Sequence, residues 1–124
     1  MDIEALIKKI LDCAVDVRKS LAAGYLEKVY ENALILELRQ NGLKAESQKP
    51  LDVRYKGQTV GEFIADIVVE DYVILEIKAV REQNSIHESQ LVNYLTTTGI
   101  DHGLLLNFGN ESKIQIKRKF RKSI

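Results

Sequence analysis

The sequence has one cysteine, two histidines and no long apolar run, and each scarcity excludes a class of protein. The single cysteine, Cys13, cannot form an internal disulfide, which fits a reducing compartment. No apolar run approaches the length of a membrane span and no signal-peptide pattern opens the chain, so we expect a cytoplasmic protein without a membrane partner. His87 and His102 are far apart and lack an HExxH pattern, which argues against zinc hydrolysis.

The composition is that of an ordinary globular protein, with 45% hydrophobic and 29% charged residues in a chain of 124. The chain contains no glycine-rich phosphate loop, internal repeat or Pro/Gly/Ser-rich linker, so we expect one domain over residues 1–124. The net charge is zero, yet residues 113–124 contain six basic residues and no acid. This segment is either a solvated terminus or a strip that contacts phosphates. The candidate nucleic-acid-binding residues in it are Lys117, Arg118, Lys119, Arg121 and Lys122.

Apolar spacing predicts three helices. The first runs over about residues 3–20, with Asp2 as its N-cap. The second starts near Gly24 and stops at Gly42. The third covers about residues 85–98.

Alternating, β-branched segments predict three antiparallel strands over residues 49–55, 58–69 and 72–80. The run "HGLLLNFG" is typical of a strand buried on both faces. The following "SKIQIKRKF" is typical of an edge strand. The order of elements is α-α-β-β-β-α-β-β, which favours an α/β fold.

Three charged residues interrupt the apolar hairpin "FIADIVVEDYVILEIKAV": Asp66, Glu76 and Lys78. Glu76 and Lys78 are two apart on one strand and therefore share a face. If the hairpin is centred on Asp71, Asp66 lies opposite Glu76. An even two-residue turn would instead put the two carboxylates on opposite faces. A site at these residues therefore requires a bulge or an odd-length turn.

On one face, two carboxylates form a hard-oxygen site of the kind that Mg²⁺ prefers. The lysine ammonium could orient a water molecule or stabilise charge on a phosphate. The alternative is that the acids and the lysine form cross-strand ion pairs on a solvent face. On spacing alone, this alternative is favoured.

Two further segments shift the balance. In "GYLEKVYENAL", Gly24, Glu27 and Tyr30 recur every three residues, which places the last two on one helix face. Glu27 could bind a metal, or it could be an ordinary helix-start acid beside a half-buried tyrosine. In "QLVNYL", Gln90 and Tyr94 share a helix face and can hydrogen-bond phosphate or water, although a surface glutamine above a packed tyrosine is common.

Together these segments resemble the PD-(D/E)XK nuclease superfamily, and more narrowly the small proteins named for a GxxExxY motif. The motif spans residues 24–30, and the superfamily's acidic motif matches Ala65-Asp66 and Glu76-Ile77-Lys78. Ala65 replaces the usual proline, which removes no ligand. Gln90 and Tyr94 match the QxxxY element of RecB-like nucleases. The similarity covers nearly the whole chain.

The resemblance implies a restriction-endonuclease-like fold, a central mixed β-sheet flanked by helices. It implies that Asp66 and Glu76 hold one or two Mg²⁺ (or Mn²⁺) ions together with the carbonyl of Ile77, and that Glu27 completes the acidic cluster. Lys78 would position or activate the attacking water. Gln90 and Tyr94 would steady the site or the scissile phosphate.

The leading hypothesis is thus a metal-dependent nuclease acting on DNA, in repair, recombination or defence. A second hypothesis is a nuclease fold that binds nucleic acid or a protein partner without cutting, because 124 residues leave little protein beyond the catalytic core. A third is a structural or assembly protein whose acids only pair with lysines. We expect a homodimer by analogy, since small cores often pair to hold a duplex.

Overall fold

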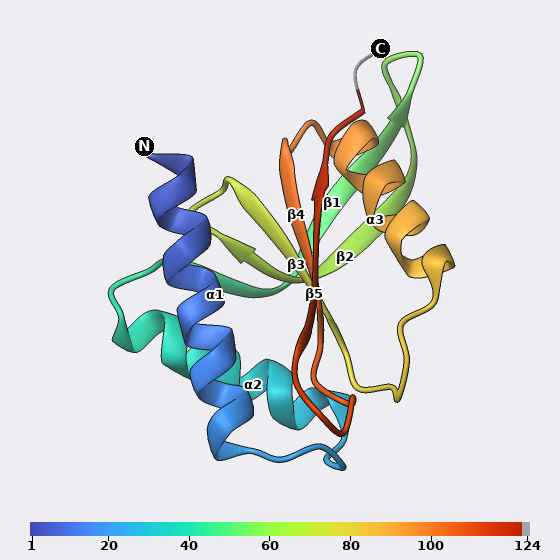
Figure 1. Ribbon diagram of the computed structural model, residues 1–124. Coiled ribbons are helices and arrows are strands. Elements are labelled where there is room, and N and C mark those ends of the chain that lie inside the picture. Colours follow the sequence, from blue (N-terminus) through green and yellow to red (C-terminus); the bar gives the residue numbers. More distant parts are fainter. Residues whose placement is uncertain (123–124) are drawn as a thin grey trace.

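The computed structural model describes residues 1–122 and contains eight elements in the predicted order. They are α1 (Ile3–Ser20), α2 (Glu27–Gln40), β1 (Ala45–Tyr55), β2 (Gln58–Val69), β3 (Val73–Lys78), α3 (Ser85–Thr98), β4 (His102–Asn107) and β5 (Gln115–Phe120) (Figure 1). β1 starts four residues earlier than predicted, and β3 ends two residues earlier.

The helix starts follow from local chemistry. The Asp2 side chain accepts a hydrogen bond from the Ala5 N–H at 3.1 Å, so the predicted N-cap of α1 is confirmed. The predicted start of α2 near Gly24 is wrong, because the helix begins at Glu27. Gly24 has a φ of 118°, which lies outside the helical region and places this residue in the preceding loop.

The five strands form one sheet in the order β1-β2-β3-β4-β5. β1, β2 and β3 form an antiparallel meander, whereas β3 and β4 are parallel. A parallel pair needs a crossover connection, and α3 provides it. β5 pairs antiparallel with β4 at the sheet edge, as predicted from its alternation of apolar and basic residues.

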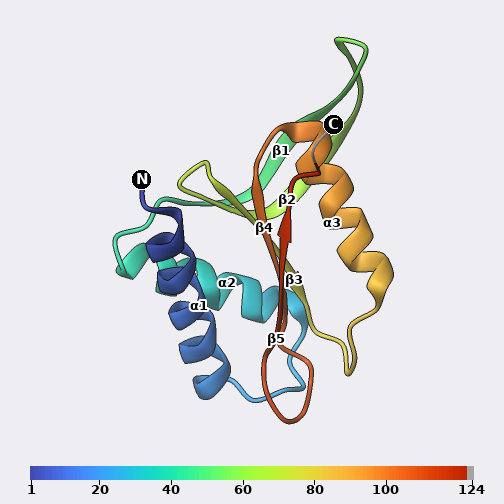
Figure 2. The same cartoon turned by 45° about the horizontal axis from the view of Figure 1, so that its top comes forward.

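Helices cover both faces of the sheet (Figures 1 and 2). α1 and α2 pack on one face and α3 packs on the other. Leu104 and Leu106 contact the α1/α2 side, and Leu105 between them contacts the α3 side. β4 is therefore buried on both faces, which explains its unbroken apolar run.

The turn between β2 and β3 sets the register of the hairpin. Val69 pairs with Val73, so three residues form the turn, and Ile67 pairs with Leu75. Within the turn, Glu70 and Asp71 have φ angles of 54° and 62°. The turn is therefore odd in length and centred on Asp71, which is one of the two arrangements that a site at Asp66 and Glu76 requires.

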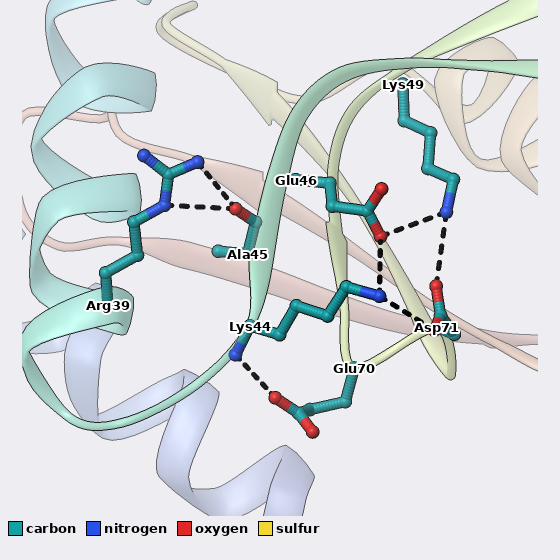
Figure 3. Close-up of polar contacts among 7 residues, drawn as sticks. All are labelled: Arg39, Lys44, Ala45, Glu46, Lys49, Glu70 and Asp71. Carbon is teal, nitrogen blue, oxygen red and sulfur yellow. Dashed lines mark hydrogen bonds and ion pairs between the residues drawn. The ribbon is translucent and has the colours of Figure 1, made fainter.

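Polar contacts tie this turn to the start of β1 (Figure 3). The Glu70 N–H donates to the Lys44 carbonyl at 2.9 Å, and the Lys44 N–H donates to the Glu70 carboxylate. The Lys44 and Lys49 ammonium groups lie 3.2 and 3.1 Å from the Asp71 carboxylate, and Lys49 also contacts Glu46. The hydrogen bonds from Lys49 and Lys44 lower the pKa of Asp71. These contacts hold a left-handed turn in place.

Candidate functional site

The side chains of strand β2 change from one face of the sheet to the other at Asp66. Ala65 packs with the α3 side of the sheet, whereas Ile67 packs with the α1/α2 side. Residues two apart in a regular strand point to the same face, so the strand twists sharply between them. On β1, Gln48 lies between Ser47 and Lys49, which pair with Ile67 and Ala65, and it has a φ of 49°. The pairing of β2 with β3 ends at Ile67 and Leu75, so Asp66 lies where the two strands begin to separate.

Asp66 and Glu76 meet at this separation. Asp66 Oδ2 accepts a hydrogen bond from the Ile77 N–H at 2.8 Å, and Glu76 Oε1 accepts one from the Asp66 N–H at 3.4 Å. Burial raises the pKa of Glu76 to about 9, and the neighbouring Asp66 carboxylate is the second cause. The two carboxylates are therefore costly to ionise together, and a cation beside them would remove that cost.

Lys78 lies beside this pair without neutralising it. Its side chain is partly buried and lines a small pocket together with Glu76. No ion pair joins Lys78 to a carboxylate within residues 1–122. The alternative in which Asp66 and Glu76 merely pair with Lys78 is therefore wrong for this hairpin.

Helix α3 supplies the opposite wall of the pocket. Gln90 and Tyr94 share one helix face, as predicted, and both line the pocket with Glu76 and Lys78. The Tyr94 ring stacks on Phe63 of β2, with a centroid distance of 3.8 Å and an interplanar angle of 8°. Tyr94 is thus held in place, whereas Gln90 is exposed at the mouth.

Glu27 lies at the rim of the site. It is the first residue of α2 and is exposed, yet nearby protein atoms displace enough water to raise its pKa. The charge of Lys78 counteracts this rise in the pKa of Glu27, and the charge of Asp66 adds to it. The Glu27 carboxylate therefore interacts electrostatically with both residues. No group of three or more His, Cys, Asp or Glu side chains in the described chain is arranged to hold a metal. The structure therefore brings Asp66 and Glu76 together and leaves Glu27 outside that pair.

Tyr30 is fully buried, so the half-buried tyrosine of the alternative interpretation is wrong. Its hydroxyl donates to the Ala22 carbonyl and accepts from the Tyr25 N–H at 3.2 Å. Its ring stacks on Phe108 with a centroid distance of 5.0 Å. Tyr30 fixes the loop before α2 and thereby the position of Glu27.

Half of the six basic residues in the C-terminal strip are engaged in ion pairs. Three of its five candidate residues contact acids at 2.6–2.7 Å: Arg118 with Glu4, Lys119 with Glu88 and Arg121 with Asp101. Lys117 and Lys122 are exposed and form no ion pair within the described residues. The last two residues of the strip, 123–124, lie outside the described chain.

Two residues near the site were not predicted. Glu31 is buried and accepts hydrogen bonds from Lys28 Nζ at 2.8 Å and Gln48 Nε2 at 2.9 Å. The sequence feature that could have identified Glu31 is its position four residues after Glu27, on the same helix face. His87 lines the pocket under α3 and its Nδ1 is buried without a hydrogen-bond partner. The sequence feature that could have identified His87 is its position three residues before Gln90, which places both on one helix face.

The donors at the strand separation suit a hard cation. Two carboxylates and the Ile77 carbonyl are oxygen ligands, and Mg²⁺ or Mn²⁺ accepts such a set while keeping several waters. The burial of Glu76 beside Asp66, which makes the two carboxyl groups costly to ionise together, is the structural sign of this fit.

Comparison with known families gives the class of the protein. A family model described as the PD-(D/E)XK nuclease superfamily matches residues 4–119, and the chain belongs to this superfamily. Its mixed five-stranded sheet flanked by helices agrees with the restriction-endonuclease-like fold. Nucleases of this superfamily generally use divalent metals and bind nucleic acid. No curated protein and no solved structure matched the chain. None of the helices within residues 1–122 is long and apolar enough to cross a membrane.

Proposed function

We propose that the chain is a Mg²⁺- or Mn²⁺-dependent nuclease that hydrolyses phosphodiester bonds of DNA, and that it belongs to the narrower GxxExxY group. The observation that carries this proposal is the Asp66–Glu76 pair, which lies at the strand separation with an unneutralised Lys78 beside it. The superfamily assignment supports the same chemistry.

Each residue of the site has a role in this proposal. Asp66, Glu76 and the Ile77 carbonyl hold the cation, which when bound would polarise the phosphodiester and promote ionisation of water. Lys78 places its ammonium where negative charge grows on the phosphate. Gln90 and Tyr94 orient the phosphate from the α3 side.

The remaining candidates act around this centre. Glu27 adds negative charge at the rim, where it reinforces attraction of the cation. Lys117 on β5 and Lys122 just beyond β5 contact DNA phosphates. The neighbouring basic residues Arg118, Lys119 and Arg121 contribute to the positive potential. We place the activity in repair, recombination or defence of DNA in the cytoplasm, and we propose a homodimer that holds a duplex.

A second candidate function is a non-catalytic nucleic-acid-binding module. The observation that favours it is that Glu27 does not join Asp66 and Glu76 in a three-acid cluster. In this alternative the basic residues bind phosphates and the acidic pair only shapes the fold. The two candidates differ in whether any phosphodiester bond is cut.

The test compares the wild type with Lys78→Ala and with Lys56→Ala, a control at the exposed β1–β2 hairpin tip. Each protein is incubated with single- and double-stranded DNA and Mg²⁺ or Mn²⁺. We expect Lys78→Ala to lower the cleavage rate about 10²–10³-fold and Lys56→Ala to cut normally. The proposal fails if pure wild-type protein cuts no substrate, or if Lys78→Ala cuts as fast as the wild type.

A further inference from the structure

A second hollow lies at the end of β3, where the chain leaves the strand after Lys78. Three segments line it: residues 23–25 of the α1–α2 loop, 79–81 after β3 and 109–111 after β4. The loops after α1 and after β4 lie at the same end of the molecule (Figures 1 and 2). Ala79 directly follows Lys78, and Tyr25 lies two residues before Glu27. The hollow therefore adjoins the candidate site.

The walls of the hollow are formed by tightly packed backbone. A Cβ on Gly109 would lie 2.4 Å from the Val80 nitrogen, so only glycine permits this close approach. The buried side chain of Asn107 accepts hydrogen bonds from the N–H groups of Val80 and Gly109, at 2.9 and 3.1 Å. It also donates to the Val80 carbonyl at 2.8 Å. Close packing and hydrogen bonds thus hold the backbone together on this side of the hollow.

Tyr25 presents an aromatic ring in this hollow. The residue is 52% exposed, and the edge-on contact of its ring with the Tyr30 ring has a centroid distance of 6.0 Å. Tyr30 in turn stacks on Phe108, and both are fully buried. Tyr25 is therefore an exposed aromatic surface anchored to the core, which is the feature that single-stranded nucleic-acid sites use for base stacking.

Arg81 supplies a cation at the same place. Its side chain is 88% exposed, and its only ion pair within the described chain is a 3.9 Å contact with Glu111. Exposed pairs of this kind contribute little, so a phosphate can displace Glu111. The hollow has a volume of about 310 Å³, which lies at the lower end of the roughly 300–1,000 Å³ range of small-ligand sites.

We propose that this hollow binds one unpaired nucleotide next to the scissile phosphate, with its base on Tyr25 and its phosphate at Arg81. This inference rests on the proposed nuclease function and specifies its substrate as single-stranded or frayed DNA, because a base within a duplex cannot lie on the Tyr25 ring. Stacking accepts every base, so the subsite has little sequence preference.

The test measures binding in EDTA, where cleavage is suppressed, by fluorescence anisotropy. It uses a labelled thymidine oligonucleotide and a strand of equal length built from abasic residues. We expect the wild type to prefer the thymidine strand about 5- to 100-fold. Tyr25→Ala should lose this preference, and Tyr25→Phe and Tyr25→Trp should keep it. The matched control is Tyr72→Ala, since Tyr72 is 49% exposed at the opposite end of β3.

Arg81 gives a second measurement that does not depend on the folding of a Tyr25 variant. Arg81→Ala should reduce the slope of log affinity against log salt by about 1. Glu111→Gln should tighten binding several-fold, because it removes the competing carboxylate. Equal binding of both strands by the wild type, an unchanged preference in folded Tyr25→Ala, or an unchanged salt slope in Arg81→Ala would each overturn the subsite.

These outcomes are separable from the fate of the nuclease proposal. If the wild type cuts DNA, and the Tyr25→Ala variant binds and cuts DNA as well as the wild type does, the nuclease function is retained and the subsite is lost. A chain that never cuts but shows the Tyr25-dependent preference retains the subsite and loses the nuclease function.

Discussion

Asp66 and Glu76 occupy the first position beyond the β2–β3 ladder, where each carboxylate accepts a hydrogen bond from the backbone of the other strand. Side chains thus replace the next rung of the ladder and hold the strands at the separation. The arrangement keeps two acids close in a partly buried place, so ionising both of them in the folded, metal-free protein is costly.

The stability of the metal-free protein should fall with rising pH because of Glu76. In the unfolded chain this carboxyl titrates near 4.5, and in the folded chain near 9. Between these values the folded state keeps a proton that the unfolded state has lost, so the unfolding free energy decreases as pH rises. Glu76→Gln should flatten this dependence and stabilise the protein by on the order of 2 kcal/mol at pH 8. Urea unfolding in EDTA near pH 6 and pH 8 measures it.

The control for this measurement is Glu62→Gln, which changes an exposed carboxylate on β2. It should leave the pH dependence as it is in the wild type. A Glu76→Gln protein with the wild-type pH slope would show that Glu76 is already ionised in the fold.

Divalent cations should stabilise the protein through the same pair. A ligand at about 100 times its Kd adds roughly 2.7 kcal/mol to the unfolding free energy. We expect Mg²⁺ or Mn²⁺ to raise Tm in the wild type and in Asp52→Asn, an exposed control on β1, but not in Asp66→Asn. Because binding competes with the proton on Glu76, the shift should grow as pH rises. An equal Tm shift in Asp66→Asn would place the cation elsewhere.

The left-handed turn at Asp71 should resist β-branched residues. Asp71 has a φ of 62°, which aspartate and asparagine tolerate better than valine does. We expect Asp71→Val to lower Tm by roughly 5–10 °C and Asp71→Asn to lower it less. Differential scanning calorimetry measures both. Equal Tm values for the two variants would mean that the backbone of the turn is not strained.

Asn107 should matter for stability more than its amide alone suggests. It is fully buried and bonds the N–H and carbonyl groups of Val80. Asn107→Leu leaves these backbone groups unsatisfied and should cost about 3 kcal/mol in urea unfolding. The exposed Asn93→Leu on α3 is the control and should cost little. A cost below 1 kcal/mol for Asn107→Leu would indicate that water replaces the amide.

The basic strip should divide into two functional kinds. Lys117→Ala and Lys122→Ala should weaken DNA binding and each reduce the salt slope by about 1. Arg118 donates two hydrogen bonds to Glu4, at 2.7 and 2.8 Å, so Arg118→Ala should mainly lower Tm. Anisotropy titrations at several salt concentrations, together with thermal melts, separate the effects. If only Arg118→Ala changed the salt slope, Arg118 rather than Lys117 and Lys122 would contact the DNA phosphates.

The sequence predicts the element order because that order depends on local patterns, whereas it predicts the hairpin register only on the condition that Asp66 and Glu76 form one site. Helical and alternating spacings reveal the helices and strands, and charged residues within apolar strands reveal Asp66 and Glu76. The start of α2 escapes prediction, since its pattern continues smoothly through Gly24 and only the backbone angle excludes that residue. The reversal of β2 also escapes it, because Ala65 and Ile67 are both apolar whichever face they occupy.

Contacts between distant elements are beyond such patterns. Arg118 and Glu4 are 114 residues apart, and nothing local in the basic strip signals that this arginine is already paired. The hollow at Tyr25 and Arg81 could not be predicted for the same reason, because its three walls come from loops that lie far apart in the chain.

The three-residue turn between Val69 and Val73 makes the site depend on parity rather than on loop length. Inserting or deleting one turn residue would move Glu76 to the other face of the sheet and separate it from Asp66. Inserting two would lengthen the hairpin and keep the two carboxylates together. Chains with turns of different size can therefore carry the same pair, provided that the number of turn residues stays odd.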